Sequence, residues 1–352
     1  MDNIGGAEYV DLILARELGA DIYTTNIDKK KIAKMGFGTD NIFSIGKIPI
    51  NAPQKQELAY WRFKNLKLGK KYDYYIIGGD WAVSGAASNK PNLWYVYSPI
   101  REIWDLYEYT RKNTVAWHKG WIFALWVKYH RFLNRHDVQG VGQIVSISQN
   151  VRKRVKKYLN KDSLVIYPPT DTSKYHFGKV GDYWLSVNRL ITHKRVDMQL
   201  EAFRNLPEEK LVIVGSFEQS RHFLSYASYI KRVRPKNVSV ISWVDSSELV
   251  ELYANCKGFI TTSHDEDYGM TAVEAMASGK PVIAPKEGGY TETVIDGKTG
   301  MLIENINAQK LASAIKKIGK DPEQYKNACI NQAKKFDKDI YISKIKELIK
   351  CN

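Results

Sequence analysis

The sequence predicts an α/β protein with two domains that face each other across a cleft. Short apolar runs alternate with stretches of helical spacing along most of the 352 residues, a pattern typical of parallel sheets covered by helices. The length also suits two domains. We therefore expect an N-terminal domain at 1–170, a C-terminal domain at 171–336 and a closing helix at 337–352. Apolar residues follow helical spacing in the last segment: Ile342, Ile345, Leu348 and Ile349.

The expected strands are the short apolar runs. In the C-terminal half they lie at 183–190, 210–217, 238–244, 258–262, 281–285 and 301–303. The N-terminal half repeats the scheme less regularly, with candidates at 21–25, 72–77, 93–97, 144–147 and 164–167. Pro168 and Pro169, followed by polar residues, mark the linker between the halves.

The composition is that of a folded protein with excess positive charge. Hydrophobic residues make up 44% of the chain, which argues against disorder. The net charge is +15, and residues 1–178 carry +11 of it (27 Lys+Arg minus 16 Asp+Glu). Such an excess favours nucleic acid, an anionic membrane surface or phosphorylated ligands as partners. The three cysteines are scattered, apolar runs are too short for a bilayer, and no leader opens the chain. We therefore expect a cytoplasmic protein, with peripheral membrane contact left open.

The densest signal is the segment 266–284. It reads as an acidic loop, a glycine turn, a helix, a second glycine and a buried strand. A helix that begins near 269–271 would direct backbone N–H groups and a positive dipole end at the preceding loop, which suits a diphosphate. Glu274, within about the first turn, could accept hydrogen bonds from the two hydroxyls of a ribose. Glu266 would lie close to the sugar.

A second cluster, 187–197, follows an expected strand and opens a helix. Arg189 and Lys194 would both project from the end of that strand. Because a departing nucleoside diphosphate gains negative charge in the transition state, two fixed cations there would stabilise that state.

The two clusters resemble the motifs of retaining GT-B glycosyltransferases of family 4, also called group 1. Glu266 and Glu274 match the E-x7-E motif of that family, and Arg189 and Lys194 match its R-x4-K pair. Arg195 stands where its K-G-x-D motif has glycine. Residues 5–8 resemble its G-G-A-E loop, and 104–106 with 287–294 resemble the mannosyltransferase branch.

The resemblance implies two Rossmann-like domains and transfer of a hexose, with retention, from a nucleotide-sugar to a glycan or lipid-linked acceptor. GDP-mannose is the favoured donor, a UDP-sugar stays open, and no metal or other cofactor is implied. The implied catalytic residues are Arg189, Lys194 and Glu266. The implied donor-binding residues are Gly5, Gly6, Gly215, Gly269, Met270, Thr271 and Glu274. The implied acceptor-side residues are Tyr97, Ser98 and Arg101.

Two features depart from the family pattern. The first strand of the family precedes the G-G-A-E loop, whereas here only four residues precede Gly5. We therefore expect the N-terminal domain to lack that strand and the chain to start at an internal methionine, with an apolar strand encoded in frame upstream. Tyr97 stands where many relatives carry histidine; it can donate a hydrogen bond but cannot serve as a base near neutral pH.

The segment 101–135 combines seven Lys/Arg residues with four tryptophans: Trp104, Trp117, Trp121 and Trp126. This combination suits the headgroup layer of an anionic membrane. A core-facing helix with solvated charges is the alternative.

Four other functions are alternatives to a glycosyltransferase. A sugar-nucleotide epimerase would share the fold, and a phosphorylase would need a cofactor lysine motif that the sequence lacks. A catalytically impaired homologue is a third alternative. A nucleic-acid-binding module would suit the charge, but the sequence has no RRM-type motif or zinc-finger spacing, so we expect no nucleic-acid partner.

Overall fold

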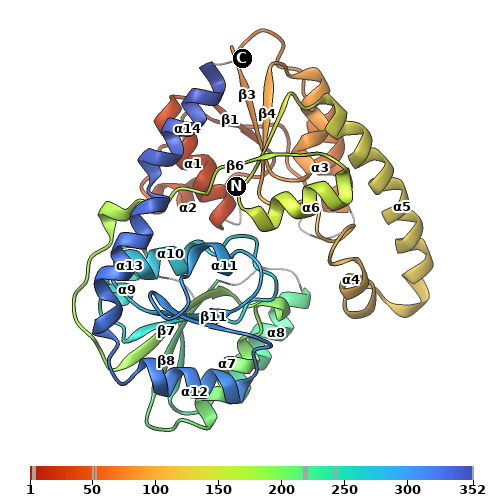
Figure 1. Ribbon diagram of the computed structural model, residues 1–352. Coiled ribbons are helices and arrows are strands. Elements are labelled where there is room, and N and C mark those ends of the chain that lie inside the picture. The colour runs from red at the N-terminus through yellow and green to blue at the C-terminus, as the bar shows by residue number, and fades with distance from the viewer. Residues whose placement is uncertain (2–4, 50, 52–53, 217–220, 242–243, 351–352) are drawn as a thin grey trace. The chain divides into compact units, whose positions relative to one another are not determined.

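The computed structural model describes residues 1–352 except 2–4, 50, 52–53, 217–220, 242–243 and 351–352. The chain forms two compact units (Figure 1). Unit 1 comprises residues 1–167 and 344–352, and unit 2 comprises residues 168–343. The division falls at the Pro168-Pro169 pair. The last helix, α14 (Lys338–Lys350), begins in unit 2 and ends in unit 1.

Unit 2 is built on a parallel sheet with the order β12-β11-β10-β7-β8-β9. Its strands are β7 (Tyr183–Arg189), β8 (Lys210–Ser216), β9 (Val238–Ile241), β10 (Gly258–Ile260), β11 (Val282–Pro285) and β12 (Gly300–Ile303). Each coincides with a predicted apolar run. The order runs outward in both directions from β7, so the topological switch point lies between β7 and β10. Ligands of open α/β sheets bind at such a point, beyond the carboxyl ends of the strands.

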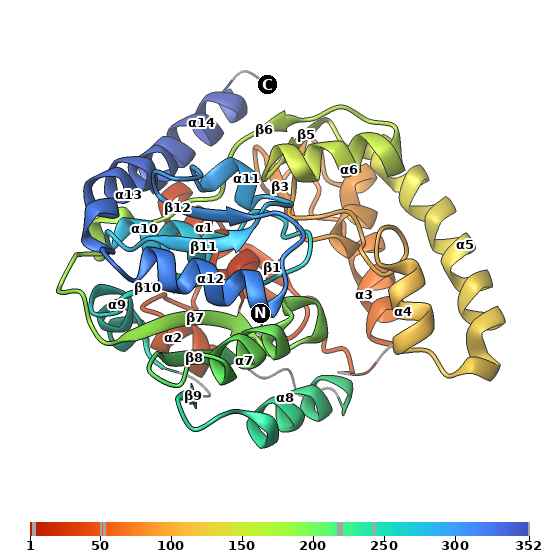
Figure 2. The same ribbon diagram turned by 60° about the horizontal axis from the view of Figure 1, so that its bottom comes forward.

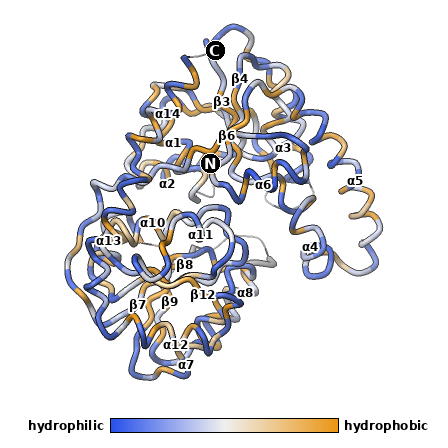
Figure 3. Tube along the Cα trace, viewed as in Figure 1, coloured by the Kyte–Doolittle hydropathy of each residue, from blue (hydrophilic) through white to orange (hydrophobic). Residues whose placement is uncertain are grey.

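Helices cover both faces of this sheet, as Figure 2 shows. One face carries α7 (Val196–Arg204), α8 (Arg221–Val233) and α12 (Ala308–Ile318). The other carries α9 (Ser246–Ala254), α10 (Met270–Ala277) and α13 (Lys326–Ala333). The core between sheet and helices is apolar, with Trp184, Phe203 and Ile315 completely buried, and hydrophobic colour follows the strands in Figure 3. Burial of both faces explains why these strands read as continuous apolar runs.

Unit 1 holds a smaller parallel sheet with the order β3-β4-β5-β6. Its strands are β3 (Tyr75–Gly78), β4 (Asn92–Val96), β5 (Gln143–Ser146) and β6 (Leu164–Val165). The expected strand at 21–25 forms β1 (Ile22–Thr24), which pairs with β2 (Ile42–Ser44) in a separate two-stranded sheet. The sequence did not predict β2. Residues 2–4, which precede the glycine loop, lie outside the described residues.

The helices of unit 1 are α1 (Gly6–Leu18), α2 (Lys29–Lys34), α3 (Gln54–Lys64), α4 (Tyr107–Asn113), α5 (Gly120–Asp137) and α6 (Gln149–Leu159). Strand β4 is the centre of this core, because all five of its residues are buried. Its carboxyl end leads directly to Tyr97 and Ser98. The fold is therefore the predicted one, two α/β domains with parallel sheets.

Candidate active site

The predicted catalytic residues of unit 2 gather at the topological switch point of its sheet. Arg189 is the last residue of β7 and is exposed. Lys194 ends the short helix η5 (Thr192–Lys194) that follows. Glu266 lies on the loop that follows β10. The two strands are neighbours, so the parallel arrangement brings their loops together.

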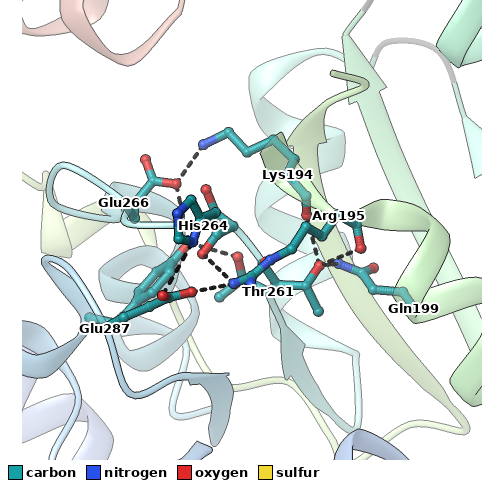
Figure 4. Close-up of polar contacts among 10 residues, drawn as sticks. Lys194, Arg195, Gln199, Thr261, His264, Glu266 and Glu287 are labelled. Atoms are coloured by element: carbon teal, nitrogen blue, oxygen red, sulfur yellow. Dashed lines mark hydrogen bonds and ion pairs between the residues drawn. The ribbon is translucent and has the colours of Figure 1, made fainter. Parts of the chain in front are cut away.

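Lys194 and Glu266 form an ion pair with 2.5 Å between Nζ and Oε2 (Figure 4). Their side chains are 13% and 17% exposed. Burial by itself raises the pKa of Glu266, but the charge and hydrogen bond of Lys194, together with smaller contributions from Ser263 and His193, outweigh it and lower that pKa to about 2. Glu266 is therefore a carboxylate at neutral pH, able to accept a hydrogen bond from a sugar hydroxyl but not to supply a proton.

Arg195 contacts residues of the loops that follow β10 and β11 (Figure 4). Its Nε donates to the carbonyl of Thr262 at 2.6 Å and its Nη2 to that of Ser263 at 3.2 Å. It also pairs with Glu287, which lies 3.3 Å from Nδ1 of His264. Arg195 has φ of +50°, the left-handed region. This backbone conformation favours glycine, so the guanidinium contacts hold a residue whose backbone is strained.

Glycines allow the loops after β10 and β11 to pack backbone to backbone. Gly269 has φ of +90°, and a Cβ there would lie 2.5 Å from the ring of Tyr290. Gly288 has φ of +59°, and its Cβ would lie 2.5 Å from the carbonyl oxygen of Glu266. The Gly289 amide donates to that same oxygen at 2.8 Å. Substituting Gly288 would therefore displace Glu266, and substituting Gly269 would displace Tyr290.

Helix α10 begins directly after this loop, at Met270 and Thr271. Its N-cap is Gly269, and no side chain caps this end. Glu274 is the fifth residue of the helix, just beyond the first turn. The Tyr253 hydroxyl donates to Glu274 Oε2 at 2.9 Å, and burial raises the pKa of this carboxyl. The N-terminus can bind an anion beside this acidic side chain.

Gly215 lies near the end of β8, opposite Asn188 of β7. A Cβ at this position would come within 2.8 Å of Leu190 Cγ. Close packing against Leu190 is thus enough to explain why residue 215 is glycine. A contact of Gly215 with a donor stays a prediction.

The predicted residues Gly5, Gly6 and Tyr97 lie in unit 1. Gly5 caps α1 and Gly6 begins it, with the Gly5 amide donating to Glu8 Oε2 at 2.9 Å. Tyr97 follows β4, and its hydroxyl donates to Asp11 Oδ1 at 2.6 Å. Tyr97 thus donates to a carboxyl group of its own unit, and its contact with an acceptor stays a prediction.

Ser98 and Arg101 join a second polar group of unit 1. Ser98 Oγ accepts from Arg154 Nη1 at 3.1 Å. Arg101 pairs with Asp105 at 2.8 Å, and Arg154 Nε lies 4.0 Å from that same carboxylate. Both predicted acceptor-side residues are therefore held by neighbours after the carboxyl end of β4.

Sequence reasoning missed three carboxyl groups of unit 1: Asp11, Asp80 and Glu102. A Cβ on Gly78, the last residue of β3, would come within 2.5 Å of Asp11 Oδ1, so Asp11 lies at that strand end. Burial raises the pKa of Asp11 and of Asp80 to about 7, and it also raises that of Glu102. The available signal was the position of Asp80, two residues beyond a parallel strand.

Among the described residues, no group of three or more His, Cys, Asp or Glu side chains is placed to hold a metal ion. No helix among the described residues combines the length and apolar character needed to cross a bilayer.

Residues 169–336 match the family model of glycosyl transferases group 1. Among curated proteins, an uncharacterized glycosyltransferase of Methanocaldococcus jannaschii is 25% identical over 210 residues, 59% of this chain and 58% of that protein. The alpha-1,3/1,6-mannosyltransferase ALG2 of Dictyostelium discoideum is 28% identical over 226 residues, 53% of this chain and 54% of that protein. The matches thus span between half and three fifths of these relatives.

Solved structures resemble the whole chain. The Anabaena protein Alr3699/HepE, in complex with UDP and glucose, has a TM-score of 0.76 at 17% identity and covers 99% of this chain and 97% of its own. The sucrose-phosphate synthase of Thermosynechococcus elongatus has a TM-score of 0.78 at 16% identity, with coverage of 98% and 93%. The chain therefore has the GT-B fold, and its segment 169–336 is similar to the glycosyl transferases of group 1.

Proposed function

We propose that the protein is a retaining glycosyltransferase of family 4 that takes a hexose from a nucleotide-sugar. One observation carries the proposal: the Lys194–Glu266 ion pair lies at the switch point of unit 2, and its Glu266 is on the loop that leads into the N-terminus of α10. We assign donor binding to 171–336, acceptor binding to 1–170 and a closing role to 337–352.

Each residue at this point has a proposed task. The diphosphate lies against the amides at 269–271, and Glu274 accepts hydrogen bonds from the ribose hydroxyls. As the bond between the sugar and the phosphate oxygen breaks, the phosphate keeps the electron pair. Arg189 and Lys194 stabilise this growing charge. Glu266, kept ionised by Lys194, holds a hydroxyl of the hexose.

The acceptor hydroxyl attacks from the face that the diphosphate leaves, so the configuration is retained, and its proton passes to the leaving phosphate. Gly5 and Gly6 approach the donor phosphates in this proposal. Tyr97, Ser98 and Arg101 hold the acceptor. No metal takes part in this scheme.

The donor is proposed to be GDP-mannose. Support comes from the resemblance of 287–294 to the mannosyltransferase branch and from the two ALG2 mannosyltransferases among the relatives. A UDP-sugar is the second candidate, because the similar Anabaena structure holds UDP and glucose. The acceptor is a glycan or a lipid-linked molecule, reached from the cytoplasmic side by peripheral contact with an anionic membrane.

Thermal stabilisation by nucleotides tests the donor site. A ligand that binds the folded state raises the melting temperature once its concentration exceeds Kd. We expect one of GDP, UDP, GDP-mannose and UDP-sugars to stabilise the wild type and not Glu274→Ala. Glu274→Gln, which keeps an acceptor for Tyr253, separates loss of the ligand from damage to the fold.

Three results would count against the proposal. If a nucleotide stabilised Glu274→Ala and Glu274→Gln as much as it stabilises the wild type, Glu274 would not belong to the donor site. Conversion of the donor without any acceptor would favour an epimerase, and binding without transfer to any acceptor would favour an impaired homologue.

A further inference from the structure

Helix α5 carries polar residues on its buried face and apolar residues on its exposed face. The buried polar side chains are His130, Asn134 and Asp137. The large exposed ones are Trp121, Ile122, Leu125, Tyr129 and Phe132. A helix on a water-exposed surface normally has the reverse arrangement. The outer face of α5 is therefore suited to a neighbour less polar than water.

Specific contacts fix this orientation of the helix. Nε2 of His130 lies 2.6 Å from Oε1 of Glu57, on α3. At the last residue of α5, Asp137 pairs with Lys64 at 2.5 Å. Rotating α5 to bury its apolar face would break both contacts. The exposed apolar face thus follows from how the helix is anchored.

The exposed residues form one continuous stripe. Positions 121, 125, 129 and 132 are spaced by four, four and three residues, so they share one side of the helix. Trp117, just before the helix, is 92% exposed, and Trp121 and Phe132 are 66% and 68% exposed. Hydrophobic residues recur along the α5 tube in Figure 3. With several aromatic side chains in it, this stripe covers on the order of several hundred Å² of apolar surface.

The charge around the stripe selects its partner. Residues 109–136 contain six Lys or Arg and no Asp or Glu. Lys119 and Lys128 are exposed beside the stripe. A second copy of the chain would bring two such basic surfaces together, which is unfavourable. An anionic bilayer offers the opposite charge and an interface in which tryptophan is favoured.

We propose that the outer face of α5 docks on an anionic lipid bilayer, with its aromatic side chains among the headgroups. The apolar stripe and the flanking lysines act together, because hydrophobic insertion and attraction to anionic lipid add in such surface helices. This inference deepens the proposed function and rests on it for its purpose, since docking would bring unit 1 to a lipid-linked acceptor. Docking itself needs neither donor nor acceptor.

Co-sedimentation with vesicles tests the surface. The full chain is mixed with phosphatidylcholine vesicles that contain or lack phosphatidylglycerol, at low and high salt. We expect binding to the anionic vesicles only, weaker at high salt because the Debye length falls from about 10 Å at 0.1 M to about 3 Å at 1 M. Trp121→Ser with Phe132→Ser should weaken binding roughly tenfold or more at both salt concentrations.

Matched variants and the melting temperature control for the fold. Leu224→Ser with Tyr229→Ser replaces two exposed apolar residues of α8 and should leave binding unchanged. Lys119→Gln with Lys128→Gln should reduce the salt dependence.

No binding to anionic vesicles at low salt would overturn the proposal, as would binding that the aromatic variant retains. A wild-type dimer that fails to bind vesicles, and becomes monomeric in the aromatic variant, would assign the face to a second copy instead. Because nucleotide binding is measured separately, loss of docking and loss of the donor site are distinguishable.

Discussion

Glu266 at the carboxyl edge of the unit 2 sheet and Asp11 and Asp80 at that of unit 1 have pKa values shifted in opposite directions. In unit 2, Lys194 stands against Glu266 and keeps the pKa of that carboxyl at about 2. In unit 1, burial raises the pKa of Asp11 and Asp80 to about 7. Equivalent positions in two parallel sheets are thus suited to different chemistry. At the unit 2 edge, fixed charges can lie opposite a bound diphosphate. At the unit 1 edge, the pKa values of the carboxyl groups lie near neutral pH, which suits hydrogen bonds with the hydroxyl groups of a sugar.

Removing the cation of the unit 2 edge should have the largest effect. In Lys194→Ala, Glu266 is left mostly buried without its partner, so we expect a loss of about 2–3 kcal/mol in the free energy of unfolding. We also expect kcat/KM for transfer to fall about 100-fold or more, because a cation near the leaving group is gone. Urea denaturation and a transfer assay measure the two effects.

Lys210→Ala is the matched control in the same unit. Lys210 pairs with Asp182 at 2.6 Å, but both side chains are largely exposed. Its loss should change the free energy of unfolding far less than the loss of Lys194, because solvent screens an exposed pair. Equal losses in the two variants would show that burial does not distinguish these pairs.

The contributions of Asp11 and Asp80 to stability should also respond to pH with the opposite sign to that of Glu266. The folded pKa of Asp11 and Asp80 lies above the ordinary value of 3.8, so the folded state binds more protons between about pH 4 and 7. Stability from these groups therefore falls as pH rises through that window. The folded pKa of Glu266 lies below 4.5, so its contribution is complete above pH 4.5 and is lost as pH falls toward about 2.

Single amide substitutions separate these contributions. Asp11→Asn keeps an acceptor for Tyr97 and should flatten the decline between pH 4 and 7 by on the order of 1–2 kcal/mol. Glu266→Gln should remove the stability that Glu266 contributes above pH 4.5 and should change the slope of the profile only below that pH, while Asp73→Asn, at an exposed position, should leave the profile unchanged. Denaturation midpoints across pH measure this, and an Asp11→Asn profile that matches the wild type would contradict the buried state of Asp11.

The smallest expected effect concerns backbone strain. Arg195 and Asn160 both have φ of +50°, one in each unit. Arg195→Ala and Arg195→Gly lose the same guanidinium contacts, but glycine relieves the left-handed strain, so it should be more stable than alanine by about 1 kcal/mol. Asn160→Gly should change stability by less than about 0.5 kcal/mol, because asparagine tolerates this conformation. Thermal denaturation that ranks Arg195→Gly at or below Arg195→Ala would show that φ costs nothing there.

The sequence predicted the unit 2 edge well because its residues are close together in the chain. The segment 266–284 contains loop, glycine, helix and strand in one run, and the apolar runs around it are buried strands of a parallel sheet. Periodicity is most reliable for such strands. The R-x4-K pair likewise follows one strand.

The unit 1 acids could not be predicted in the same way. Asp11 comes from α1 and Tyr97 from the end of β4, 86 residues apart. The same holds in unit 2 for the contact between Arg195 and Glu287, which are separated by 92 residues. Such contacts depend on how strands are ordered, which local pattern does not encode. Strand β2 was missed because it has three residues, two of them exposed.

The most direct test of the account is calorimetric titration of GDP and UDP into the wild type, Glu274→Ala and Asp80→Asn. The two variants each alter one carboxyl at the carboxyl edge of one sheet. We predict that one nucleotide binds the wild type and Asp80→Asn with similar Kd, and binds Glu274→Ala at least tenfold more weakly. Unchanged binding in Glu274→Ala together with lost binding in Asp80→Asn would contradict the assignment of the donor to unit 2.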